Sequence, residues 1–160
     1  MDTPKPLSTQ DERVIAALSH VTSLFPMMGI IAPIIIWVTQ RERSKFVAFQ
    51  SLQALAYQIS MLLFFIIGMA CYTVSFFGTF FTIPLAATAE NNSAMPVLFF
   101  IFFAIPFIVM GVLFVSHFIL TLYGVVGAVM ALGGKDFRYL VIGRMVERYM
   151  NQPEKKEEIS

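Results

Sequence analysis

The residues best suited to chemistry in this sequence are its two histidines, His20 and His117, which both lie within long apolar runs. An imidazole can bind haem or a metal ion and can relay protons. Ionisable groups inside apolar, membrane-spanning runs are costly to place, which makes them functional candidates. However, no further cysteine, aspartate or glutamate accompanies them in these runs to complete a metal shell. We therefore expect both histidines to form hydrogen bonds between helices, with a haem or metal carrier as a remote alternative.

A second polar set follows a basic turn at residues 41–45. Gln50, Gln53, Tyr57 and Ser60 recur at helical spacing, so they share one face of a helix. Because amides both donate and accept hydrogen bonds, this stripe would bond to a neighbouring helix, dock a partner or line a polar conduit. Hydrogen bonding between helices is the expected role, and the other two stay open.

The sequence offers no pattern typical of an enzyme. It has no nucleophile–base pair, no paired carboxylates, no phosphate loop and no zinc-ligand spacing. The single cysteine, Cys71, lies in an apolar run, and a net charge of +1 gives no basic field for nucleic acid. We expect a protein that is not an enzyme and holds no cofactor.

The distribution of charge indicates a lipid-embedded chain. Hydrophobic residues make up 58% of the sequence and charged residues 13%. Between Phe46 and Gly134, Glu90 is the only Asp, Glu, Lys or Arg. A soluble segment of that length would need charges on its solvent-facing surface. The sequence therefore predicts an all-α, polytopic membrane helix bundle.

Three apolar runs and one short helix organise the chain. We expect a single domain over 11–150, with disordered tails at 1–10 and 151–160. Its runs are 14–38, 46–83 and 97–132, and an amphipathic helix at 137–150 lies along the membrane surface. A cap at Ser8 or Thr9 would begin a helix near residue 11. About three transmembrane segments result.

The first run leaves two topologies open. Its 25 residues are enough for one kinked span, since a span needs roughly 20. Pro26, Gly29 and Pro33 would instead allow a helix–break–helix wedge that enters the membrane and returns. Length favours the single span, with the N-terminus outside. The wedge would put the N-terminus inside.

Small and basic residues supply further candidate sites. Four small residues near the end of the third run would let another helix approach closely: Gly124, Gly127, Ala128 and Ala131. Six cations would bind anionic lipid headgroups and anchor the cytoplasmic side: Arg41, Arg43, Lys45, Arg138, Arg144 and Arg148.

The loops fix the expected orientation. Three basic residues lie in the 41–45 turn, none in the polar loop at 85–96, and six from Lys135 onward. The positive-inside rule then places the turn and the C-terminus in the cytoplasm and Glu90 outside. We expect a multi-pass protein of the bacterial inner membrane.

Three stretches resemble a known family. They are DERVIAALSHVTSLFPMMGIIAPIIIWV at 11–38, RERSKFVAFQSLQALAYQI at 41–59 and AVMALGGKDFRYLVIGRMVERY at 128–149. Together they resemble small bacterial proteins similar to the twenty-kilodalton subunit of the chloroplast inner-envelope (Tic) translocon. The resemblance implies a small α-helical inner-membrane protein; the plant relative is linked to preprotein import.

These observations favour a protein that acts through helix–helix association. We expect it to be a subunit or assembly partner of a membrane complex, in contact with the lipid bilayer and with a protein partner or a second copy. The alternative is an oligomeric, translocon-like conduit for polypeptide or small solute.

Overall fold

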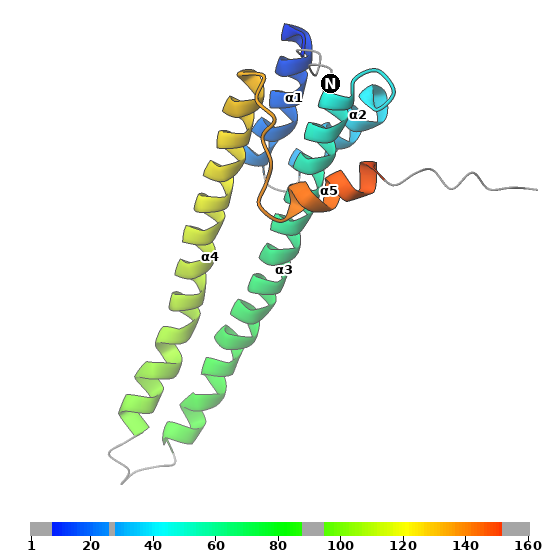
Figure 1. Cartoon of the computed structure of the whole chain (residues 1–160). Helices are drawn as coiled ribbons and strands as arrows, with labels where there is room; N and C mark the ends of the chain where they lie inside the picture. The colour runs from blue at the N-terminus through cyan, green and yellow to red at the C-terminus, as the bar shows by residue number, and fades with distance from the viewer. Residues whose placement is uncertain (1–7, 26–27, 88–94, 152–160) are drawn as a thin grey trace, which may run out of the picture. The chain divides into compact units, whose positions relative to one another are not determined.

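Every regular element that the structure describes is a helix. The computed structural model describes residues 8–25, 28–87 and 95–151. In order, its elements are α1 (Gln10–Val21), short 3-10 turns at Thr22–Leu24 and Met28–Ile30, α2 (Ile31–Gln40), α3 (Lys45–Ala87), α4 (Met95–Leu132) and α5 (Ile142–Met150) (Figure 1). The expected all-α class is confirmed for this part of the chain. The expected tails and the loop around Glu90 fall wholly or largely outside the described residues.

The chain forms two compact units. One contains residues 1–60 and 121–160, and the other contains residues 61–120. The long helices α3 and α4 each contribute to both units. Within the first unit, α1, α2 and α5 pack with the start of α3 and the end of α4.

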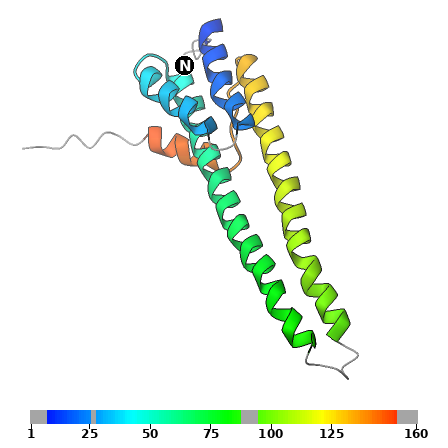
Figure 2. The same ribbon diagram turned by 180° about the vertical axis from the view of Figure 1, so that it is seen from behind.

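The first apolar run is a helical hairpin. α1 begins at a capping box, in which Thr9 and Glu12 each bond to the other's backbone N–H. After the turn, α2 comes back along α1 (Figure 2). The hydroxyl of Ser44, just beyond α2, lies near the Glu12 carboxylate and lowers its pKa. The start of α1 and the end of α2 are therefore neighbours.

Close contacts fix the turn of this hairpin. Gly29 lies so near the backbone oxygen of Thr22 that a Cβ at that position would collide with it. At 12 and 10 residues, α1 and α2 are about 18 and 15 Å long, whereas a bilayer core is about 30 Å thick. Neither helix is long enough to cross it alone. The run holds two short helices, and the single kinked span that its length favoured is not confirmed.

α4 ends in a glycine cap that redirects the chain. Gly134 has a φ of +69°, a left-handed conformation that suits glycine. Its N–H bonds to the Ala131 oxygen at 2.9 Å, and the Lys135 N–H bonds to the Met130 oxygen at 3.1 Å. This pair of bonds is the Schellman motif. It releases residues 135–141 from the helix.

Residues 61–120 form a hairpin from the middle of α3 and most of α4. Gly68 allows the Leu113 side chain to approach, and the Thr79 hydroxyl donates to the Phe102 oxygen at 3.2 Å. α3 does not end with the predicted run 46–83, but continues through Pro84 to Ala87. Pro106 likewise lies inside α4.

Two helices are long and apolar enough to cross a membrane. They are Lys45–Pro84 and Phe99–Leu132, which are 40 and 34 residues long. Only 6% and 11% of their most apolar windows are buried within the described chain. The core helix of a soluble protein would be mostly buried, so the cover for these surfaces has to come from elsewhere.

Candidate functional site

The candidate site is built on the segment between α4 and α5. Residues 135–140 are not helical, and Phe137 and Tyr139 are 7% and 3% exposed. An extended segment leaves its backbone N–H and C=O groups without helical partners. Because a buried, unpaired backbone group is costly, other groups must satisfy them.

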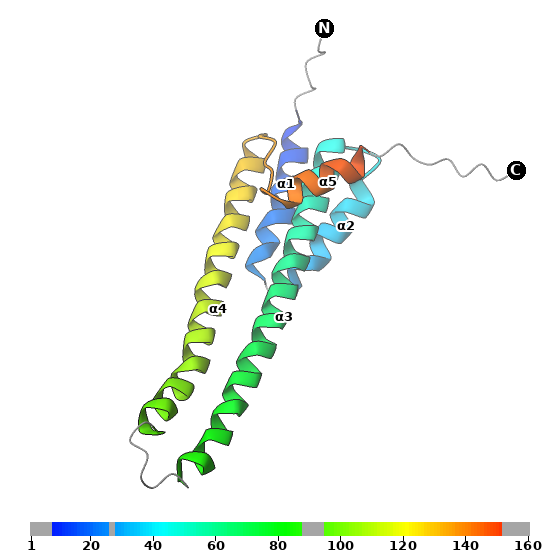
Figure 3. The same cartoon turned by 60° about the horizontal axis from the view of Figure 1, so that its bottom comes forward.

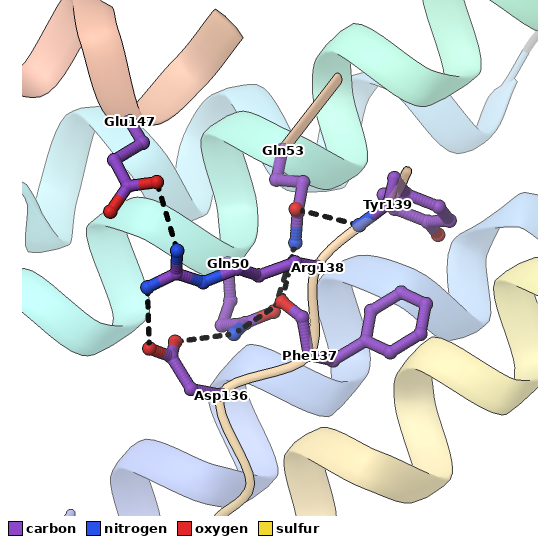
Figure 4. Close-up of polar contacts among 7 residues, drawn as sticks. All are labelled: Gln50, Gln53, Asp136, Phe137, Arg138, Tyr139 and Glu147. Atoms are coloured by element: carbon purple, nitrogen blue, oxygen red, sulfur yellow. Dashed lines mark hydrogen bonds and ion pairs between the residues drawn. The ribbon is translucent and has the colours of Figure 1, made fainter. Parts of the chain in front are cut away.

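Gln50 and Gln53 of α3 satisfy these backbone groups. The amide nitrogen of Gln53 donates to the Phe137 oxygen at 2.9 Å, and its amide oxygen accepts from the Tyr139 N–H at 3.0 Å (Figure 4). The amide nitrogen of Gln50 donates to the same Phe137 oxygen at 3.2 Å. Both glutamines are completely buried. We call this pair with its two backbone partners the glutamine clamp.

His20 lies against the glutamine clamp. Its Nε2 is 3.0 Å from the Gln50 amide oxygen, and its Nδ1 is 3.1 Å from the Tyr139 hydroxyl. The Gln50 nitrogen is committed to Phe137, so its oxygen faces the histidine and Nε2 must carry the proton. Nδ1 then accepts from the Tyr139 hydroxyl. Burial lowers the pKa of His20 to about 4, which keeps the ring neutral.

Aromatic rings pack around the same segment. The rings of Tyr57 and Tyr139 stack with centroids 4.1 Å apart and planes at 8°. Tyr123 of α4 meets Tyr139 edge-on at 5.1 Å and Phe137 at 5.8 Å. Burial raises the pKa of Tyr139. The segment is thus held by α1, α3 and α4 at once.

Arg138 points to the outer side of the segment. Its two terminal nitrogens bond to Glu147 of α5 at 2.8 Å and to Asp136 at 3.3 Å (Figure 4). The guanidinium also lies over the Phe49 ring, 5.8 Å from its centroid. The two carboxylates raise the pKa of Arg138. This network joins the segment to α5.

The predicted helix at 137–150 therefore begins five residues late, at Ile142. Residues 137–139 cannot be helical while the glutamine clamp binds the Phe137 oxygen and the Tyr139 N–H. Asp136, Phe137 and Tyr139 were not predicted as members of the site. Nor was Gln58, whose amide nitrogen donates to the Ser19 oxygen at 3.2 Å and to the Thr22 hydroxyl at 3.0 Å.

The structure brings Gln50, Gln53 and Tyr57 together but separates them from Ser60. The buried sector of α3 includes Val47, Ala54 and Met61, and Ser60 lies outside it. Its exposed hydroxyl bonds back to the Ala56 oxygen.

The four predicted small residues of α4 face other parts of the same chain, chiefly α1 and the clamped segment, residues 135–140. Gly124 meets Ser23 and Tyr57; Gly127 meets Phe137 and His20; Ala128 and Ala131 pack with Ala16 and Ala17.

The remaining predicted residues are not members of the glutamine clamp. His117 is in the 61–120 unit, where its ring is 6.2 Å from that of Phe65. The six predicted anchor cations are exposed: Arg41, Arg43, Lys45, Arg138, Arg144 and Arg148. Arg41 lies over Trp37 and is 3.7 Å from Glu42.

This arrangement is suited to holding a segment in place. Both ring nitrogens of His20 are bonded, one to Gln50 and one to Tyr139. The amide atoms of Gln50 and Gln53 are also all bonded, to His20, to each other, to Asp136 or to the backbone of residues 137–139. The described residues contain no group of three or more potential metal ligands.

The fold and the apolar helices define a small α-helical membrane protein with an internally bonded polar cluster. Sequence comparison assigns it more narrowly. The chain belongs to the magnetosome magnetite crystal formation protein family (MamF/MmsF), whose profile matches residues 11–146. No curated protein and no solved structure gave a match.

This match corrects the earlier assignment to the Tic-twenty-like family. The three stretches that carried that resemblance are a broken apolar run, a basic turn before a polar-to-apolar helix, and a small-residue helix end with a basic helix after it. Basic residues flank membrane helices in general, and small residues occur wherever membrane helices pack closely. Such features can recur in unrelated membrane proteins, so the expected link to translocon relatives is wrong.

Proposed function

We propose that this chain is a non-enzymatic integral protein of the magnetosome membrane that takes part in magnetite crystal formation by associating with other membrane helices. The description of its family, magnetosome magnetite crystal formation, supports a role in this process. The observation that carries the mode of action is the outward apolar surface of α3 and α4. Large side chains such as Val74, Phe81 and Phe114 are at least 74% exposed within the chain. Lipid and partner helices would cover them.

Two glycines on these helices favour close approach by a partner. A Cβ added at Gly78 or Gly111 would meet no atom within 4 Å, so neither glycine is needed for packing inside the described chain. In membranes, helices associate through small residues that let their backbones come close. Gly68, by contrast, is occupied by Leu113 of the same chain.

The proposed topology has two spans and a wedge. α3 and α4 cross the membrane, and the α1–α2 hairpin enters it and returns. The N-terminus, the 41–45 turn and the C-terminus then share the cytoplasmic side, with Glu90 on the other side. The packing of α2 back along α1 supports this arrangement, because it returns the chain to the side on which α1 begins. α5 would lie at the cytoplasmic interface.

Bulky substitutions at the two open glycines test the proposed association. We expect Gly78→Leu and Gly111→Leu to reduce cross-linking and co-purification with partners in mild detergent, because a leucine side chain blocks close helix approach. Both variants should still insert, since neither position is packed within the chain. Val112→Leu, which adds bulk at an exposed position about a quarter turn from Gly111 without removing a glycine, is the matched control. A wild-type protein that stays monomeric and without a partner in several detergents would contradict the proposal.

The described site gives no support to the conduit alternative. Gln50 and Gln53 are the groups that would have faced water in a conduit, and both are buried against residues 137–139. A haem or metal carrier gains no support either, because both nitrogens of His20 are already bonded.

A further inference from the structure

α5 presents two different surfaces. Its inner side carries Gly143 and Val146, which are buried. A Cβ at Gly143 would come within 2.8 Å of the Gln53 amide oxygen and 3.1 Å of the Arg138 Cβ, so this side fits closely against the glutamine clamp. Figure 3 shows α5 lying across the first part of α3. The contact fixes which side of α5 faces away from the protein.

The outer side combines an apolar stripe with cations. Val141, Met145 and Tyr149 recur every four residues and are 71%, 64% and 62% exposed. Beside this stripe run Arg144 and Arg148, also four residues apart and exposed. Large apolar side chains flanked by arginines are typical of helices that lie in a membrane interface.

The two arginines remain available for an anion. Glu147 is the acidic residue of α5, and its carboxylate is bonded to Arg138. Within the described residues no ion pair includes Arg144 or Arg148. A surface hollow is lined by Arg144, Glu147, Arg148 and Asn151. Guanidinium groups form paired hydrogen bonds with phosphate, which suits this hollow to a phosphate group.

The length of α3 places this surface near the headgroups. Its apolar portion is 40 residues, about 60 Å of helix, which is twice the bilayer core. The excess leaves room for the first turns of α3, including Gln53, at the interface. α5 packs on those turns and so would reach the same depth.

From these observations we propose that the outer face of α5, formed by Val141, Met145 and Tyr149 with Arg144 and Arg148, binds the anionic surface of the protein's own membrane. The apolar stripe enters the boundary between headgroups and acyl chains. The arginines bind lipid phosphates in the hollow beside it. This inference rests on the proposed membrane-spanning function and adds a lipid class and a surface to it.

The test places a fluorescent label on the outer face in the full-length protein. Met145→Cys is labelled with a polarity-sensitive dye in a Cys71→Ser background and reconstituted into vesicles of phosphatidylcholine with or without phosphatidylglycerol. With phosphatidylglycerol, the emission should shift to the blue and be quenched by lipid-attached quenchers. Since each arginine near an anionic surface contributes roughly fivefold, Arg144→Gln with Arg148→Gln should lower the ratio of inserted to released helix roughly 25-fold.

The matched control is Arg41→Gln with Arg43→Gln, which removes the same charge from the other basic segment and should leave the label in lipid. A label that stays in water with phosphatidylglycerol, or that ignores the loss of Arg144 and Arg148, overturns the proposal. A blue-shifted label that no lipid-attached quencher reaches indicates a protein partner and also overturns it. Alkaline carbonate extraction distinguishes failure of the proposed lipid contact from failure of the membrane-spanning function. Resistant protein with a water-exposed label refutes the lipid contact alone, whereas extractable protein refutes the membrane-spanning function and this inference together.

Discussion

At the scale of single residues, Gln53 has the most demanding position in the protein. Its one amide pairs with a backbone oxygen and a backbone N–H two residues apart, at 2.9 and 3.0 Å. It thereby takes the place of a neighbouring strand for residues 137–139. Gln50 donates to the same Phe137 oxygen, and its own amide oxygen bonds to Nε2 of His20. Loss of one side chain would therefore expose several buried groups.

Substitution of Gln53 by alanine should destabilise the protein. The Tyr139 N–H would be left buried without a partner, which costs about 1–3 kcal/mol of unfolding free energy. Denaturation in detergent measures that loss, and hydrogen exchange at Tyr139 should become faster. Ser60→Ala is the control, because the Ser60 hydroxyl is exposed and bonds within its own helix. If the two variants were equally stable, the glutamine clamp would not be holding the segment.

The buried histidine should make stability depend on pH. The pKa of His20 falls from 6.5 to about 4 in the folded protein because burial penalises the charged ring. The unfolded chain therefore takes up this proton first. The contribution of neutral His20 to the free energy of unfolding is complete above about pH 6.5. It is lost as the pH falls toward 4, by about 3 kcal/mol in all.

The comparison with His20→Gln isolates this effect, since the variant lacks the titrating ring. Wild-type protein should lose more unfolding free energy than the variant between pH 7 and pH 4. Other groups, such as Glu12, titrate in both proteins and cancel in the difference. Parallel pH profiles would show that His20 is accessible to protons in the folded state.

The sequence predicted part of this site for physical reasons. Gln50, Gln53 and Tyr57 fall on one face by helical spacing, and His20 is a polar group in an apolar run that needs a partner. Their partner could not be predicted, because Tyr139 fits equally well on the apolar side of a helix. The Schellman motif at Gly134 and two bonds to Gln53, 84 and 86 positions away along the chain, keep the segment extended. Pattern analysis over a short window does not detect such distant contacts.

At the scale of elements, the end of α4 works as a platform for α1 and the clamped segment. Its glycines remove side chains where His20, Ser23 and Phe137 approach. Ala128 and Ala131 extend the same close packing against Ala16 and Ala17. The platform brings a helix from one end of the chain against a segment from the other.

Adding one methyl group at Gly127 should disturb that platform. A Cβ there would come within 2.9 Å of the Phe137 ring and 3.1 Å of the His20 Nδ1. Overpacking of this kind typically costs about 1–3 kcal/mol, which exceeds the gain of about 1 kcal/mol from replacing a helical glycine by alanine. Thermal unfolding of Gly127→Ala should therefore begin at a lower temperature than that of the wild type.

Gly133→Ala provides the comparison, because its nearest contact would be an ordinary 3.4 Å. A Gly127→Ala variant as stable as Gly133→Ala would mean that the segment does not pack on α4 as described.

Most helices were predictable from apolar runs and prolines. The C-terminal end of α3 was not, because Pro84 is accommodated within the helix rather than ending it.

At the scale of the whole molecule, the number of membrane crossings determines the topology. Composition and charge segregation predicted a membrane protein, and its membership of the magnetosome magnetite crystal formation family is established by the match over residues 11–146. Run length favoured a third span at residues 14–38. The run forms two helices too short to cross, and α2 packs back along α1. Two spans and a wedge account for these contacts.

Labelling with a membrane-impermeant maleimide tests this topology most directly. Single cysteines are introduced as Thr3→Cys, Ser93→Cys or Asn151→Cys in a Cys71→Ser background, in the cytoplasmic membrane of a bacterial host. In intact spheroplasts only the Ser93→Cys variant should react, and the other two should react after lysis. Reaction of Thr3→Cys before lysis would show that residues 14–38 cross the membrane and would contradict the two-span account.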